Sequence, residues 1–315
     1  MRKHTEGLAL SHPGHLFAVS EALLTALIWS SSFVGVKVAL AYTGPFTVAG
    51  LRYFLAFLFL LPWLFKKQGR SLSLTLAQWS RFTLMGLIQY TIGNGALFLA
   101  LKTLSATTGS LALCLVPIPV LLLGIVRLKE QPRPVQLLGL AITIGGSVLF
   151  FSPGLELGDP LPLGLLAIAI LSFSAFPVLA REVARDRQVE NVTLTALPLG
   201  IGGGILLILA GVVEGIPHMP LFAWGVILGL AMVNTLIAYL LFNHSLQHLT
   251  AVEANVMLNL APLGTALIAW GALDERLLPV QIAAMLLVVG GASLAQWRKR
   301  TKASPRLNST PLEGR

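Results

Sequence analysis

The feature that most constrains this chain is a series of ten apolar stretches, each about twenty residues long, which fill most of its 315 residues. An α-helix rises about 1.5 Å per residue, so about twenty apolar residues cross a hydrocarbon layer about 30 Å thick. A soluble domain rarely contains even one such stretch. The pattern therefore predicts an all-α integral membrane protein with ten transmembrane helices. The expected spans are residues 17–38, 45–65, 79–101, 105–126, 134–152, 161–180, 192–213, 221–243, 250–272 and 279–297.

The second half of the chain repeats the first half at a spacing of 145 residues. Leucine-rich helices match by chance at several positions, but chance does not keep proline, glutamate and paired glycines in one register. Five helices per half is an odd number, so the second half is expected to enter the membrane upside down, as in many secondary transporters. The matched pairs include Pro117 with Pro262, Glu130 with Glu275, Gly145 with Gly290 and Gly146 with Gly291. We predict a cytoplasmic N-terminal segment (1–16), two five-helix repeats (17–152 and 161–297) and a basic, disordered cytoplasmic tail (298–315).

Composition and charge agree with a membrane location. Only 11% of the residues are charged and 55% are hydrophobic, whereas an average soluble domain has about 25% charged residues. The net charge of +9 comes mainly from Lys and Arg in alternate loops and in the tail, which predicts that both termini are cytoplasmic in a bacterial-type inner (plasma) membrane. The charge therefore reflects topology, and no nucleic-acid partner is expected. Cys114 is the single cysteine, and neither a metal site nor a cofactor is predicted.

Polar side chains inside the apolar spans carry the main functional signal, because each is costly unless it faces protein or water. They cluster at corresponding places in the third and eighth spans and in the fourth and ninth. We interpret them as the lining of a central substrate-binding pocket, with Trp29 as an aromatic stacking wall. The alternative is that the amides only join helices, at about 0.6–2 kcal/mol per hydrogen bond. The candidate substrate-binding residues are Trp29, Gln89, Tyr90, Asn94, Asn234, Tyr239, Asn255 and Asn259.

Four further residues have candidate roles of other kinds. Glu253 lies in the expected first turn of the ninth span and is a candidate for coupling or for substrate charge. Arg52 could attract an anionic group, although snorkelling of its side chain to the outer surface is the favoured interpretation. Pro117 and Pro262 are expected inside helices, where a missing N–H leaves a carbonyl free, so they are candidates for a gate or for a simple packing kink.

Two glycine-rich regions need separate interpretation. Glycines on the fifth and tenth spans allow close backbone approach, so these helices are expected to pack on each other or across a homodimer. The Gly-Ile-Gly-Gly-Gly segment at 200–204 lies in an apolar span and lacks the Lys-Ser/Thr ending of a phosphate loop, so it does not indicate nucleotide hydrolysis.

Several segments together resemble a known family. They are WSSSFVGVKVAL at 29–40, LRYFLA at 51–56, LKTLSATTGSLALCLVPIPVLLL at 101–123 and LQHLTAVEANVMLNLAPLGTALIAW at 246–270. This sequence resembles the EamA-type transporters of the drug/metabolite transporter superfamily over nearly all of residues 17–297. The resemblance implies a ten-helix, inverted-repeat carrier of the inner membrane whose central site is built mainly by the first, third, fourth, sixth, eighth and ninth helices. It also implies export of amino acids or related small metabolites.

The expected function is therefore secondary transport of a small-molecule substrate through the lipid bilayer by alternating access. A carrier of lipids, drugs or nucleotide-sugars is an alternative, and so is a membrane scaffold that transports nothing. An intramembrane enzyme is disfavoured, because the few acidic residues at membrane depth lie near the ends of the spans rather than in one reactive group.

Overall fold

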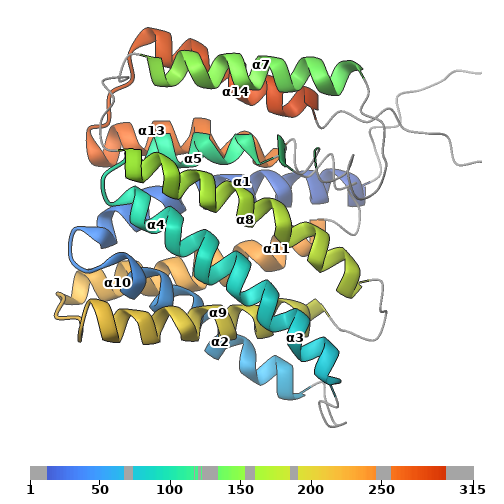
Figure 1. Ribbon diagram of the computed structural model, residues 1–315, viewed down its shortest axis with the longest axis vertical. Coiled ribbons are helices and arrows are strands. Elements are labelled where there is room, and N and C mark those ends of the chain that lie inside the picture. Colours follow the sequence, from blue (N-terminus) through green and yellow to red (C-terminus); the bar gives the residue numbers. More distant parts are fainter. Residues whose placement is uncertain are drawn as a thin grey trace, which may run out of the picture.

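The computed structural model describes residues 13–66, 74–116, 118, 119, 122, 134–152, 160–184, 191–245 and 257–295. Within these ranges the regular structure is entirely helical, and the helices run roughly side by side (Figure 1). The elements are α1 (Pro13–Leu40), α2 (Pro45–Lys66), α3 (Leu76–Met85), η1 (Gly86–Asn94), α4 (Gly95–Leu101), α5 (Ala106–Ala112), η2 (Leu113–Leu115), α7 (Pro134–Phe151), α8 (Pro160–Ala184), α9 (Asn191–Val213), α10 (Leu221–Ala231), η4 (Met232–Ile237), α11 (Ala238–Ser245), α13 (Ala261–Leu273) and α14 (Pro279–Ala295).

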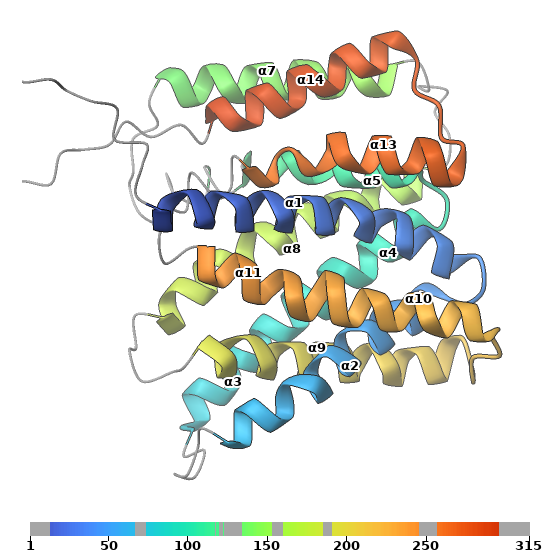
Figure 2. The ribbon, with the colours of Figure 1, turned by 180° about the vertical axis from the view of Figure 1, so that it is seen from behind.

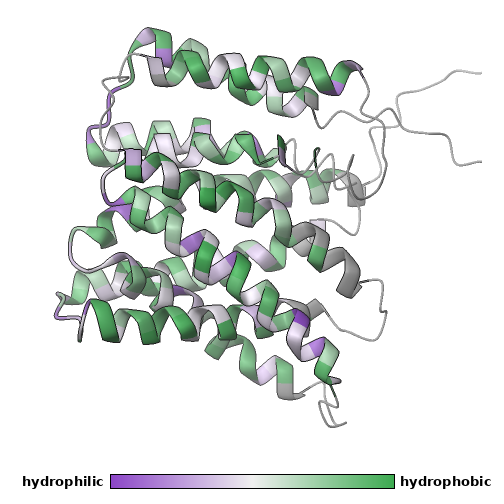
Figure 3. Ribbon diagram, in the orientation of Figure 1, coloured by the Kyte–Doolittle hydropathy of each residue, from purple (hydrophilic) through white to green (hydrophobic). Residues whose placement is uncertain are grey.

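The surface of this bundle suits a membrane. Leu76 and Leu221 are each 86% exposed and Val212 is 80% exposed, which is costly in water and favourable against acyl chains. Figure 3 shows that apolar residues dominate the helices along their whole length. These features confirm an all-helical, multi-pass membrane protein.

Five helical segments are apolar and long enough to cross a bilayer. The other five apolar helices have 10–17 residues over the part of the chain that the structure describes, so ten full spans remain a prediction. The fourth span is described only in part, since residues 123–133 lie outside the described ranges, and the described part of the ninth span is divided by a turn at Asn259 and Leu260. The long segments are Leu16–Leu40, Pro45–Leu64, Leu76–Leu101, Thr195–Val213 and Leu221–Phe242.

Four tight connections lie together at one end of the bundle, which we call the turn end. They are residues 41–44, 102–105, 214–220 and 274–278. All four lie on the left in Figure 1 and on the right in Figure 2, which shows the molecule from behind. The start of α1 and the end of α14 lie at the opposite end (Figure 2).

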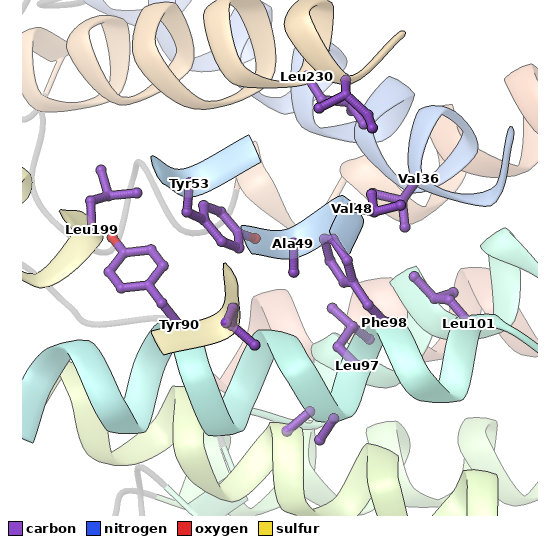
Figure 4. Close-up of a cluster of buried hydrophobic side chains, with 14 of the residues drawn as sticks. Val36, Val48, Ala49, Tyr53, Tyr90, Leu97, Phe98, Leu101, Leu199 and Leu230 are labelled. Carbon is purple, nitrogen blue, oxygen red and sulfur yellow. The ribbon is translucent and has the colours of Figure 1, made fainter. Parts of the chain in front are cut away.

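Packing joins elements that are far apart in the sequence. α2 packs along α9, α1 packs against α13 and α11, and α7 packs along α14. A large core is formed by apolar side chains of α1, α2, η1, α4, α9 and α10 (Figure 4). A second core joins α5, α7, α13 and α14, and it includes Cys114. The packing of α7 along α14 agrees with the prediction that the glycine-bearing fifth and tenth spans contact each other. The alternative, that they pack across a homodimer, remains a prediction.

Glycines in α9 explain how three helices approach one another so closely. A Cβ atom built on Gly202 would lie 2.5 Å from the carbonyl oxygen of Gly86, and one on Gly203 would lie 2.8 Å from the backbone nitrogen of Phe54. Any larger residue would therefore push η1 or α2 away. The 200–204 segment is a helix-packing surface.

Two π-helical turns interrupt the third and eighth spans. η1 covers Gly86–Asn94 and η4 covers Met232–Ile237, and a shift of 145 residues places η4 on residues 87–92, inside η1. π-helical turns are rare and are frequent at functional sites. The repeat seen in the sequence therefore extends to an irregularity of the backbone. The two π-helical turns carry four of the eight candidate substrate-binding residues, namely Gln89, Tyr90, Asn94 and Asn234.

Candidate functional site

Arg52 lies on the second helix and is turned into the bundle. Its side chain is only 6% exposed, so the prediction that it snorkels to the surface is wrong. The guanidinium donates from Nη1 to Ser32 Oγ at 2.7 Å and from Nε to Thr235 Oγ1 at 2.9 Å. It also lies 5.3 Å from the ring centre of its neighbour Tyr53. Hydroxyl groups of α1 and η4 hold it inside because they solvate the charge that lipid cannot solvate.

The π-helical turn η4 supplies a third acceptor to the same arginine. The Ala238 N–H donates to the carbonyls of Val233 and Thr235, so the carbonyl of Asn234 lacks its usual α-helical donor. That carbonyl accepts instead from Trp29 Nε1 at 3.1 Å and from Arg52 Nη2 at 3.3 Å. The π-helical geometry thus gives two polar side chains a backbone acceptor at the middle of a helix.

The side chain of Asn234 ties η4 to the first helix. Its amide nitrogen donates to Ser31 Oγ at 2.9 Å and to the carbonyl of Ile28. The amide of Asn234 therefore joins two helices, and it does so beside a buried charge. We call the group formed by Trp29, Ser32, Arg52, Asn234 and Thr235 the arginine cluster.

A second set of polar side chains links α2 to the other π-helical turn. Tyr53 donates its hydroxyl to Asn94 Oδ1 at 2.7 Å, and Asn94 Nδ2 donates to the carbonyl of Gln89 at 2.8 Å. Among the described residues, Gln89 Oε1 is buried and has no hydrogen-bond partner. Tyr53 is not among the candidates predicted from the sequence. It follows Arg52 directly in the LRYFLA segment, and no other polar residue lies at a helical spacing from it to mark a polar face.

Aromatic rings connect the two sets. The rings of Tyr53 and Tyr90 are 5.1 Å apart and lie next to each other at the large core (Figure 4). Trp29 packs edge-on against Tyr239 at 5.5 Å. The phenols of Tyr90 and Tyr239 also approach closely enough to interact. Rings of α1, α2, η1 and α11 therefore form one aromatic surface beside the arginine cluster.

The structure brings together Arg52 and six of the eight candidate substrate-binding residues, namely Trp29, Gln89, Tyr90, Asn94, Asn234 and Tyr239. Asn259 donates to Ser293 of α14 at 3.5 Å, outside the arginine cluster. Pro262 lies in the first turn of α13, which begins at Ala261 directly after a turn at Asn259 and Leu260, so the ninth span is interrupted there rather than kinked inside a helix. Asn255, Glu253 and Pro117 lie outside the described residues.

Carboxylates at the turn end have a role that the sequence analysis did not foresee. Glu275, which the sequence identified only as the repeat counterpart of Glu130, accepts the N–H groups of Ala106 and Thr107 at the start of α5. Glu214 likewise accepts the N–H groups of Phe46 and Thr47 at the start of α2. A carboxylate at a helix N-terminus satisfies donors without an intrahelical partner and suits the helix dipole.

At the same end of the bundle, a lysine binds carbonyl groups at the C-terminal end of a helix. Lys37 donates from Nζ to the carbonyls of Leu101 and Leu104, at 2.8 and 2.6 Å, where α4 ends. Within the described ranges, no group of three or more His, Cys, Asp or Glu side chains could hold a metal ion. Among the described residues, the polar groups around the buried Arg52 are therefore neutral hydrogen-bonding groups.

A helical membrane bundle whose two halves meet at buried polar groups is the arrangement expected of a membrane transporter. The model of the EamA-like transporter family matches residues 16–152 and again 161–296, so the chain belongs to this family and contains its domain twice. The resemblance noted in the sequence is thereby confirmed.

Relatives with transporter names agree. The chain is 28% identical to an uncharacterized transporter of Archaeoglobus fulgidus, over 80% of this chain and 88% of the relative. It is also 28% identical to an S-adenosylmethionine/S-adenosylhomocysteine transporter of Chlamydia trachomatis, over 88% of each. A solved crystal structure overlaps with a TM-score of 0.62 at 20% identity, over 88% of this chain and 96% of that one, which concerns the fold alone.

Proposed function

We propose that this protein is a secondary transporter that exports amino acids or related small metabolites across a bacterial-type inner membrane by alternating access. The observation that carries the proposal is the hydrogen bonding of Arg52, in the first half of the chain, to Thr235 and Asn234, in the second half. Polar groups at membrane depth are expensive and usually mark a substrate path. A polar contact between two halves can be exchanged for contacts to a solute.

The chemistry around this contact suits a small amphipathic solute. Arg52 and Trp29 supply donors, Gln89 Oε1 supplies an acceptor without a partner, and the rings of Tyr90 and Tyr239 supply apolar surface. The transporter of Chlamydia trachomatis is named for S-adenosylmethionine, an amino-acid derivative with an aromatic base. This relative, at 28% identity, supports the substrate class and leaves the particular solute open.

Alternating access requires two conformations of similar energy, which an inverted pair of halves provides. Three features support such a pair here: the 145-residue repeat, the matching π-helical turns η1 and η4, and the opposite directions of α1 and α8 in Figure 2. In this proposal the turn end faces outward and both termini are cytoplasmic.

Flux into proteoliposomes tests the function. We expect purified protein to move at least one amino acid of a full panel, and Asn234→Ala to lower the rate about tenfold, because it removes donors to Ile28 and Ser31 beside the path. Thr103→Ala, at an exposed position in a turn, is the control with unchanged flux. Flux of lipids, drugs or nucleotide-sugars alone would favour the alternative carriers, and no flux of any solute would favour a scaffold.

Cysteine labelling tests the topology in the Cys114→Ala background. A membrane-impermeant maleimide should label Thr103→Cys, at the turn end, in intact cells. Ala77→Cys, near the start of α3 at the opposite end, should react only after the membrane is opened. The reverse pattern would place the turn end in the cytoplasm and reject the proposed orientation.

A further inference from the structure

We infer that Arg52 is the binding site for a carboxylate group of the transported solute, so that the substrates of this protein are carboxylates and not merely polar metabolites. The inference rests on the proposed transport function and narrows its substrate class. It is based on the hydrogen-bond partners of the buried Arg52 guanidinium.

A guanidinium has five N–H donors in a planar fork. Three are used by described neighbours, namely Ser32 Oγ, Thr235 Oγ1 and the carbonyl of Asn234. Two donors of the terminal amino groups remain, one on Nη1 and one on Nη2. Arginine binds carboxylate oxygens through N–H donors of its terminal nitrogens, so the two donors that remain can bind a carboxylate.

The charge of Arg52 is not balanced within the described part of the chain. Its partners there are two hydroxyls, one carbonyl and the ring of Tyr53, all neutral, and the carboxylates of Glu214 and Glu275 bind helix N-termini at the turn end. A buried charge that is hydrogen-bonded but not paired remains costly. An anion arriving from water would lower that cost, whereas a neutral solute would not.

The neighbouring groups extend the site in a direction that suits an amino acid. Gln89 Oε1 is a buried acceptor without a described partner, and its helical turn is joined to the residue after Arg52 by the Tyr53–Asn94 hydrogen bond. An acceptor of this kind can bind an ammonium group but repels a second carboxylate. The rings of Tyr53 and Tyr90, 5.1 Å apart, lie beside these polar groups and offer apolar contact to a side chain.

The decisive experiment compares each amino acid with its own C-terminal amide, L-phenylalanine and L-phenylalaninamide being one pair. Binding to the purified full-length protein is measured by calorimetry in detergent, with no transport step. We expect the acids that bind to do so about tenfold to a hundredfold more tightly than their amides, because a hydrogen bond to a charged group is lost in the amide. Equal binding of acids and amides, or no binding by any acid of the panel, would overturn the inference.

Substitution of Arg52, compared with substitution of a control lysine, tests whether Arg52 is the residue that binds the carboxylate. In Arg52→Gln the acid and the amide should bind with equal affinity, whereas in Lys102→Gln, an exposed cation in a turn, the preference for the acid should be that of the unsubstituted protein. An acid preference that survives in folded Arg52→Gln protein would also overturn the inference. If that variant does not fold, the comparison of acids with amides in the unsubstituted protein still decides the matter.

Binding and flux separate the two proposals. Acid-selective binding without flux of any solute would uphold the carboxylate site and reject the transport function. Flux of amides as fast as acids, combined with equal binding, would uphold transport and reject the carboxylate site.

Discussion

Glu275 and Thr107 are 168 positions apart in the chain, yet the carboxylate of Glu275 accepts both the backbone N–H of Thr107, at 3.2 Å, and its hydroxyl, at 3.0 Å. Glu214 makes the same pair of bonds with Thr47, at 2.8 and 2.7 Å. In each case a carboxylate from a turn of the second half holds the first turn of a helix in the first half. The two contacts fasten the halves together at the turn end.

Glu275→Gln should lower the free energy of unfolding by about 1–3 kcal/mol, because it weakens charge-assisted hydrogen bonds to the start of α5. Thermal unfolding in detergent measures the loss. Asp274→Asn is the matched control, since Asp274 is exposed and its ion-pair partner in the described part of the chain is the exposed Arg276. An equal loss in both variants would mean that the turn, and not its contact with α5, is what matters.

Gly202→Ala should destabilise the protein by about 1–3 kcal/mol, because the added methyl group would meet the carbonyl of Gly86 at 2.5 Å. Gly211→Ala in the same helix has nothing within 4 Å of the added atom and should be neutral or slightly stabilising. Thermal unfolding of the two variants gives the comparison. A stable Gly202→Ala protein would show that α9 and η1 can separate at little cost.

Tyr53→Phe should cost about 1–3 kcal/mol, because it leaves Asn94 Oδ1 buried without its donor at 2.7 Å. Tyr42→Phe, at an exposed tyrosine at the turn end, removes a hydroxyl of the same kind and should change nothing measurable. Denaturation of both proteins in mixed micelles provides the values. Equal stability of the two would indicate that Asn94 finds another donor.

The α7–α14 pair allows the homodimer prediction to be tested. Gly146→Leu should destabilise the fold, because a Cβ atom there lies 2.9 Å from Val288 Cγ2, whereas Gly145 has open space around it. If the outer face of this pair forms a homodimer, Gly145→Leu should shift the molecular mass measured by light scattering from dimer to monomer while leaving stability unchanged. An unaltered mass would remove this face as the interface.

Helix positions could be predicted closely from the chain alone. The expected span 192–213 is α9 at Asn191–Val213, and 45–65 is α2 at Pro45–Lys66. Such agreement follows from the environment, since a bilayer requires continuous apolar helices whose backbone groups are satisfied within the segment. The family resemblance was equally accessible, because it depends on short segments that can be read directly.

Only part of the candidate site could be predicted from the sequence. Trp29, Asn234 and Tyr239 could be named as candidates because polar or bulky side chains are conspicuous in apolar spans. Arg52 was assigned to the surface, because near the end of a span both snorkelling and burial are open to a long side chain. Tyr53 carried no signal at all.

Local pattern thus accounts for the helices, the internal duplication and the family, since each depends on residues close together in the chain or on a fixed spacing. The inward turn of Arg52, the acceptor exposed by a π-helical turn and the carboxylates of Glu214 and Glu275 on distant helices depend on which helices pack together. Those contacts join residues more than 160 positions apart, and no periodicity of a single helix specifies them.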